Sequence, residues 1–218
     1  MPEGLEENLC VRGGSAGKFF HEVLVPCRER VVLIANEMGA KLREAAYSLI
    51  ETVNGEVLVL KRGPSGGQVG KWEFPGGKKE DDHADIVFTS LVETVEETGV
   101  YLCSAHVDPE RNREELVAEM AQVIALGKEV PFPIGFRYSF ERSKSGEPVL
   151  FLVTIIRWLI DSRVPVSLSD EHDDFEWVDR GSLSAVDFAR PFYREAALAV
   201  VDSCNKKEQA VSFELAPI

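Results

Sequence analysis

Apolar and polar residues recur with two different periods along this chain. Between residues 84 and 99, apolar side chains fall at the spacing of one helical face, namely Ala84, Val87, Phe88, Leu91 and Val95. Gly99 follows as a helix stop signal. In contrast, residues 136–140 alternate aromatic with polar side chains, as in a half-buried strand. The chain therefore mixes helices with strands, which predicts an α/β fold.

Further strands are expected on both sides of this helix. Residues 45–52 and 56–62 flank Asn54-Gly55, which is a strong signal for a β-hairpin. The longest apolar run, residues 149–160, is typical of a central strand. Residues 176–178 predict a further short strand.

Three other segments suggest helices, and the N-terminus suggests a tail. Residues 191–203 predict a C-terminal helix, and residues 111–126 predict a helix that either covers a pocket as a lid or pads the sheet. Residues 26–38 fit either a short helix beginning at a proline or an extended edge segment. Residues 1–17 show little periodicity and predict a mobile tail.

Charge and composition narrow the range of partners. The 218 residues carry a formal net charge of −13 without a local block of Lys and Arg, which argues against binding a nucleic-acid polymer or an anionic membrane. The four cysteines form no Cys-x-x-Cys pair, so neither a zinc cluster nor a disulfide framework is expected. An anionic substrate would therefore need metal ions to offset charge repulsion.

The expected compartment is the cytosol or the nucleus. The first residues are acidic, whereas a signal peptide begins with a basic stretch before its apolar core. The apolar run 149–160 is short for a membrane span and contains Arg157. The sequence thus predicts no membrane-spanning segment.

A cluster of carboxylates carries the chemical signal. Glu93, Glu96 and Glu97 stand at i, i+3 and i+4, so they share one helical face, which is expected to lie opposite the apolar stripe. Like charges this close repel each other unless a cation lies among them. A Gly-rich loop at 63–70 and a turn at Pro75-Gly76-Gly77 precede them. Together they predict a site for a hard divalent metal and phosphate.

These residues resemble the Nudix hydrolases, of the MutT-like type. The family signature places a Gly ahead of Arg-Glu-apolar-x-Glu-Glu-x-Gly-apolar, and Gly77 and the stretch from Glu93 to Val100 match it. The segment 72–78 also looks like the MutT-type approach to this box. The resemblance implies an α/β/α sandwich around a mixed β-sheet, with a Nudix domain at 44–205 between an N-terminal extension, 1–43, and a C-terminal tail, 206–218.

The box departs from the family pattern at two linked positions. Gly77 and Glu93 are one residue further apart than in the family. The family Glu falls at His83 or Ala84, and the family Arg falls at Val92. In the family these two residues form an ion pair that braces the loop against the helix. Because both are missing, no orphan buried charge remains, and the scaffold is expected to survive.

The resemblance assigns metal and catalytic roles to particular oxygens. It implies that Glu93, Glu96, Glu97 and the Gly77 carbonyl bind Mg²⁺ or Mn²⁺, which prefer oxygen donors. Glu171 lies six residues before Trp177, where related sequences place another Glu facing the metals. Glu171 is the candidate for a further ligand or for the general base.

The resemblance also suggests how substrate is held. Arg62 looks like the family's phosphate-contacting arginine, with Lys78 and Glu73 as further substrate-binding candidates. Phe192 occupies the place where MutT-type enzymes carry a base-reading Asn, so specificity for an oxidised guanine nucleotide does not carry over. Either solvent-facing or hydrogen-bonding roles are expected for His83 and His172, because hard-metal phosphate sites seldom use imidazole.

The sequence therefore predicts a Mg²⁺- or Mn²⁺-dependent pyrophosphohydrolase that acts on a small nucleoside diphosphate derivative. A nucleoside triphosphate is the first expectation and a dinucleoside polyphosphate the second. The alternative is a catalytically weak or inactive Nudix-fold module that binds a nucleotide or a protein. Homodimers occur in the family, and no feature of the sequence fixes an interface.

Overall fold

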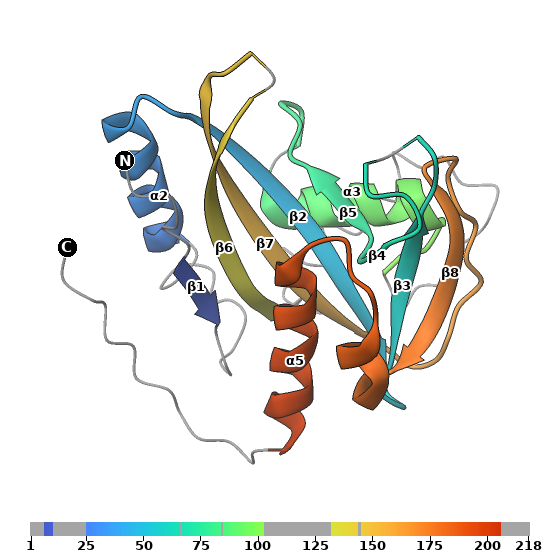
Figure 1. The fold of residues 1–218 in the computed structure, drawn as a ribbon. Coiled ribbons are helices and arrows are strands. Elements are labelled where there is room, and N and C mark those ends of the chain that lie inside the picture. Colours follow the sequence, from blue (N-terminus) through green and yellow to red (C-terminus); the bar gives the residue numbers. More distant parts are fainter. Residues whose placement is uncertain are drawn as a thin grey trace.

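One mixed β-sheet organises the part of the chain that this computed structural model describes, which is residues 7–10, 25–65, 67–83, 85–102, 132–143 and 145–205 (Figure 1). The predicted helix 111–126 lies outside these residues. In chain order the elements are β1 (Glu7–Cys10), α2 (Val25–Glu37), β2 (Lys41–Thr52), β3 (Glu56–Arg62), β4 (Trp72–Glu73), β5 (Gly76–Lys78), α3 (Ile86–Thr98), β6 (Phe132–Arg142), β7 (Pro148–Ile160), β8 (His172–Asp179), the 3₁₀ helix η2 (Arg180–Ala185) and α5 (Pro191–Asn205).

The predicted hairpin forms, but its two strands separate soon after the turn. The described strands are ordered β1-β6-β7-β2-β3-β4, and β7 runs parallel to β2. β2 and β3 pair at Glu51 and Val57, next to the turn. Further along, β2 pairs with β5 while β3 pairs with β4 and β8. The segment 72–78 therefore bridges the two diverging strands.

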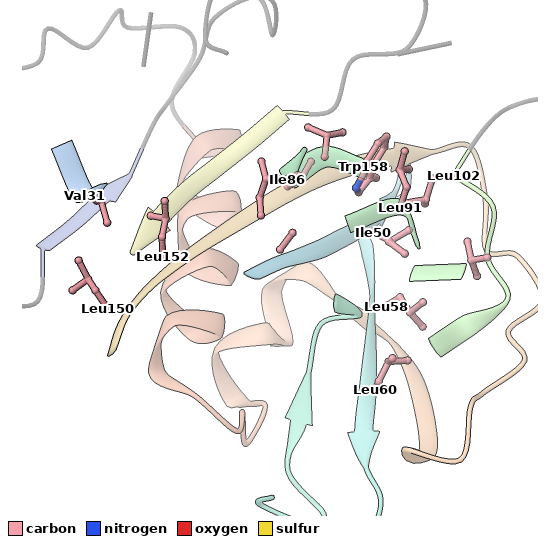
Figure 2. Packing of buried hydrophobic residues seen from close by; sticks show 14 of the residues in the cluster. Val31, Ile50, Leu58, Leu60, Ile86, Leu91, Leu102, Leu150, Leu152 and Trp158 are labelled. Carbon is pink, nitrogen blue, oxygen red and sulfur yellow. The ribbon is translucent and has the colours of Figure 1, made fainter. Parts of the chain in front are cut away.

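Alternating side chains divide the core into two layers. On β3, Leu58 and Leu60 join one cluster, with residues of α2 and α3, whereas Val57 and Val59 join the other, with residues of η2 and α5. Figure 2 shows the first cluster, in which Ile50, Leu91 and Trp158 come from a strand, a helix and another strand. In Figure 1, α5 lies in front of the sheet and α3 behind it. The observed architecture confirms the predicted α/β/α sandwich.

Helix α3 begins and ends at residues that satisfy its terminal backbone groups. The Asp85 carboxylate accepts a hydrogen bond of 2.8 Å from the Phe88 N–H. At the other end, Gly99 adopts a left-handed conformation with φ 65° and donates its N–H to the Val95 carbonyl. The predicted stop at Gly99 is confirmed.

A buried hydroxyl network fixes α3 against the sheet. Thr94 Oγ1 donates to Ser48 Oγ at 2.7 Å, Ser48 Oγ lies 3.2 Å from Ser90 Oγ, and Trp158 Nε1 donates to Ser90 Oγ at 3.2 Å. These groups come from α3, β2 and β7. Because each lost partner would leave a buried polar group unsatisfied, the network restricts how the helix can sit on the sheet.

Other contacts brace the loop before α3, where the family ion pair is missing. His83 is buried, and its Nδ1 lies 3.2 Å from Thr89 Oγ1 and accepts from the Glu80 N–H. Lys79 Nζ donates to the His83 carbonyl at 2.5 Å. A hydrogen bond between the imidazole and a hydroxyl therefore connects loop and helix here, and of the two roles expected for His83 the hydrogen-bonding one is confirmed.

Four local expectations are decided by strand pairing or helix formation. Gly76 and Gly77 do not turn as expected but belong to β5, because Gly76, with φ 148°, can lie directly against β2. Residues 7–10, expected within a tail, pair with β6 as β1. Residues 26–38 follow the helical alternative, since α2 spans Val25–Glu37. The predicted strand 176–178 is longer than expected, because β8 already begins at residue 172.

No helix in the described ranges is long and apolar enough to cross a membrane.

Gly76 offers a test of how tightly β5 is held. A Cβ at this position would lie 2.2 Å from the Ala46 carbonyl oxygen, and its φ is unfavourable for any other residue. We expect Gly76→Ala to lower the free energy of unfolding by more than ~3 kcal/mol in urea titrations. Gly70→Ala is the matched control, because Gly70 also has a positive φ but nothing within 4 Å, so it should cost only ~1–2 kcal/mol. Equal losses in the two variants would contradict close packing of β5.

Candidate active site

The carboxylates of α3 meet the glycines of β5. Glu97 is only 9% exposed, and its Oε2 accepts a hydrogen bond of 2.8 Å from the Gly76 N–H. Glu93, Glu96 and Glu97 were expected on one helical face opposite the apolar stripe. Their exposure differs, because Glu96 is exposed, Glu93 is half-buried and Glu97 is buried. Its burial follows from the strand that packs over this face of the helix.

Burial raises the pKa of Glu97 well above its ordinary value of 4.5. The hydrogen bond from Gly76 opposes this effect, while the negative charges of Glu73, Glu93 and Glu171 add to it. The same four carboxylates therefore influence one another, although Glu73 and Glu171 are distant from the helix in sequence. A cation among them would relieve both the repulsion and the cost of burial.

Glu93 lies directly against the second glycine of β5. A Cβ built on Gly77 would be 2.2 Å from Glu93 Oε2, so only a glycine leaves room for this carboxylate. Gly77 itself has no positive φ. The requirement for glycine at position 77 is thus one of space rather than of backbone conformation.

Backbone hydrogen bonds tie the loop that carries Glu171 to the same region. The Ser169 N–H donates to the Glu97 carbonyl at 3.1 Å, and the Gly63 N–H donates to the Glu171 carbonyl at 2.8 Å. The Glu171 side chain is exposed. The loop therefore places an exposed carboxylate near the end of α3, between the helix and the Gly-rich loop.

Glu73 is held by side chains of three other elements. It is only 4% exposed and forms an ion pair with Arg62. Its Oε1 lies 3.1 Å from His172 Nε2, and its Oε2 accepts from the Tyr193 hydroxyl at 3.2 Å. The donors come from β3, β8 and α5, so Glu73 joins three separate elements.

The two predicted phosphate-binding cations differ in their surroundings. The Arg62 guanidinium contacts Glu73 and also donates to the Gly67 carbonyl, which holds the Gly-rich loop in place. Lys78 is exposed and lies in β5 opposite Ala45. To contact a phosphate, Arg62 would first have to leave its partner Glu73. Lys78 is exposed and has no carboxylate partner among the residues that the structure describes.

Sequence reasoning did not find Tyr193 and gave no specific partner to His172. Tyr193 is fully buried and contacts Tyr47, Phe74, Phe188 and Phe192 edge-on or at a tilt. Its hydrogen bond to Glu73 spans 120 residues, a separation at which no local pattern is informative. For His172 the neighbouring Glu171 was the only signal, and it suggested a loop facing metal rather than a buried imidazole.

The donor chemistry suits a hard divalent cation. Glu93, Glu97 and Glu171 supply oxygen ligands of the kind that Mg²⁺ and Mn²⁺ prefer, and the gap at Gly77 leaves space for a carboxylate. Among the residues whose side chains are described, no three acidic, His or Cys groups already surround a common point. A cation would therefore have to draw these side chains together as it binds.

The fold is that of solved MutT-type structures. A MutT protein from Methanosarcina mazei Go1 aligns over 77% of this chain and 98% of its own, with 21% sequence identity and a TM-score of 0.52. The NUDIX domain of Shewanella oneidensis NrtR, solved with ADP ribose, shows 15% identity over 76% of this chain and 87% of its own, with a TM-score of 0.49. A C. elegans Ap4A hydrolase shows 16% identity over 75% and 98%, with a TM-score of 0.46. Neither a protein-family model nor a curated protein matches the sequence.

The similarity to the MutT protein defines the class of fold. The chain has the Nudix fold, as its resemblance to MutT-like sequences predicted. At this level of identity the likeness concerns the fold alone, so the chemistry must be argued from the carboxylates and their surroundings.

The raised pKa of Glu97 predicts how stability depends on pH. Because the folded protein favours the neutral acid, ionisation opposes folding once the pH rises above 4.5 toward the raised pKa. In EDTA at neutral pH, we therefore expect Glu97→Gln to have a higher Tm than wild type, with a difference that shrinks as the pH falls toward 4.5. Differential scanning calorimetry measures this. Glu37→Gln, at an exposed position of α2, should show no such trend. A Glu97→Gln protein that is less stable than wild type across the whole range would contradict the assignment.

Proposed function

We propose that this protein is a pyrophosphohydrolase that uses Mg²⁺ or Mn²⁺ to cleave a diphosphate linkage in a small nucleoside diphosphate derivative. The observation that carries the proposal is the meeting of Glu97 and Glu93 with Gly76 and Gly77, beside Glu73. Four interacting carboxylates in and around a partly buried site are costly unless a cation balances them. The Nudix fold raises the expectation of this chemistry by analogy.

Each side chain has a role in the proposed reaction. Glu93 and Glu97 would hold the cation together with Glu96 and the Gly77 carbonyl, and the bound cation would neutralise charge on the diphosphate. Glu171, exposed at the end of its loop, would accept the proton of the attacking water. Lys78 would contact a phosphate oxygen. The water oxygen forms a bond to one phosphorus while the bridging oxygen leaves in line with it.

The substrate is proposed at two levels. A nucleoside diphosphate linked to another group is the class, with a nucleoside triphosphate as the first candidate and a dinucleoside polyphosphate as the second. Phe192 is half-buried and packs against Tyr193, so it offers an aromatic surface rather than an amide that could read a base. This favours tolerance toward the base over selection of one base.

A non-catalytic binding module is the second candidate. It is favoured by the loss of the family's ion pair, with Val92 at the Arg position and His83 or Ala84 at the Glu position, and by the ion pair of Arg62 with Glu73. Such a module would bind nucleotide with an affinity that divalent metal does not strengthen, whereas a hydrolase should bind nucleotide and metal cooperatively. Isothermal titration calorimetry with and without Mg²⁺ distinguishes the two.

Turnover tests the proposal directly. Purified wild type should hydrolyse at least one member of a panel of nucleoside triphosphates, dinucleoside polyphosphates, nucleotide sugars and inositol pyrophosphates in Mg²⁺ or Mn²⁺. Glu97→Gln should reduce kcat by about 100-fold or more, because losing a ligand should cost at least as much as losing a residue that supports one. Glu37→Gln is the control for an exposed carboxylate. Product masses identify the bond that is cut. A folded wild-type protein without activity on the whole panel would sink the hydrolase assignment.

A substitution at Gly77 distinguishes an effect on the site from an effect on the stability of the fold. In Gly77→Ala the new methyl group would displace the Glu93 carboxylate, which is the mobile end of a flexible side chain, so folding should be little affected. Activity should fall by roughly 100-fold, because a shift of about 1 Å in a reacting group can cost that much. Steady-state kinetics and Tm measured on the same sample test this. A substantial drop in Tm, or full activity, would contradict the position inferred for Glu93.

A further inference from the structure

A buried imidazole lies between the two most buried carboxylates of the site. His172 is 6% exposed, and its Nε2 is 3.1 Å from Glu73 Oε1 and 4.0 Å from Glu97 Oε1. It is the first residue of β8, opposite Arg62 of β3. Neither the fold nor the metal chemistry proposed above requires a histidine here, so its position calls for a separate explanation.

The second ring nitrogen indicates which tautomer is present. His172 Nδ1 is buried and has no hydrogen-bond partner among the residues that the structure describes. If Nδ1 carried the hydrogen, a buried N–H would lack an acceptor, which is energetically costly. If Nδ1 carries only its lone pair, no donor is left without a partner. The hydrogen therefore belongs on Nε2, where it is donated to the Glu73 carboxylate.

Glu73 can fix this ring because its own position is over-determined. Arg62 pairs with the carboxylate, and the Tyr193 hydroxyl donates to Oε2, leaving Oε1 to face His172. Burial raises the pKa of Tyr193 well above 10, so the hydroxyl keeps its proton and remains a donor. A carboxylate with this many donors cannot swing away from His172 without breaking several contacts.

We propose that His172 is a positioning residue that orients the Glu97 carboxylate. The Gly76 N–H holds Glu97 Oε2, and the imidazole of His172, whose Nε2–H is donated to Glu73, lies beside the other oxygen, with Nε2 4.0 Å from Oε1, which is beyond hydrogen-bond distance. The carboxylate is thereby confined by a backbone donor at one oxygen and, at the other, by an imidazole that Glu73 holds in place. The inference rests on the proposed function, in which Glu97 is a metal ligand. A ligand held in one orientation binds a cation at a lower entropic cost, and residues that orient metal ligands typically contribute 10–100-fold in affinity or activity.

Two amide substitutions separate this role from simple packing. In His172→Gln the side-chain amide N–H can reach the place of Nε2, whereas in His172→Asn it is too short and reaches only the place of Nδ1. We expect His172→Gln to keep kcat and Mn²⁺ affinity within about 3-fold of wild type. His172→Asn should lower both by 10–100-fold, with KM changed by less than about 3-fold. Mn²⁺ affinity is measured by electron paramagnetic resonance, without substrate.

His83 provides the matched control for loss of a buried imidazole. It lies on the loop before α3, is 8% exposed, and is hydrogen-bonded through Nδ1 to Thr89 of the helix. His83→Gln should lower Tm yet leave Mn²⁺ affinity within about 3-fold of wild type. If His172→Asn and His172→Gln reduce Mn²⁺ affinity equally, or if His83→Gln reduces it as much as His172→Asn, the positioning role is overturned.

Failure of the proposed function would be distinguishable from failure of this inference. Absence of turnover in wild type would contradict the proposed hydrolase activity. The Mn²⁺ affinities of the variants would still decide whether His172 orients Glu97. Long-range ¹H–¹⁵N NMR on wild type reads the tautomer directly. A signal for hydrogen on Nε2 is expected, and hydrogen on Nδ1 would overturn the inference.

Discussion

The hydrogen bond from the Gly76 N–H to the Glu97 carboxylate is the contact on which the site depends. It requires β5 to lie on α3, which in turn requires β2 and β3 to separate beyond Glu51 and Val57 so that the segment 72–78 can bridge them. Glycines make this approach feasible, since side chains at 76 and 77 would collide with β2 and with Glu93. The close approach of the backbone at β5 and the positions of the acidic side chains therefore depend on each other in this protein.

Much of the fold could be predicted from local patterns. The helix at 86–98, its glycine stop, the hairpin turn and the central strand at 148–160 follow from period, propensity and turn chemistry, which act over a few residues. The strand at Gly76–Lys78 could not, because two glycines carry no strand signal and form one only when β2 is beside them. The N-terminal strand Glu7–Cys10 is similar, since its partner is β6.

The site shows the same division between local and remote information. Spacing alone predicted that Glu93, Glu96 and Glu97 share one helical face, but it gave no information about which of them is buried. Glu97 is buried because a remote strand covers it, and that burial raises its pKa. Arg62, the candidate for a phosphate contact, pairs with Glu73, and this pairing depends on where two strand ends meet in space. Which group an arginine side chain contacts depends on the tertiary structure, and the composition of the chain does not determine it.

The contacts of Glu73 also bear on how the chain folds. Its partners His172 and Tyr193 lie 99 and 120 residues further along, and β2 pairs in parallel with β7 across a similar separation. Topologies with many such remote contacts fold slowly, because loop-closure entropy is lost before the contacts form. During synthesis, a chain that has emerged only as far as α3 already contains every acidic residue of the helix and β4, but not the imidazole and phenol that bond to Glu73. Completion of the site therefore awaits the last third of the polypeptide.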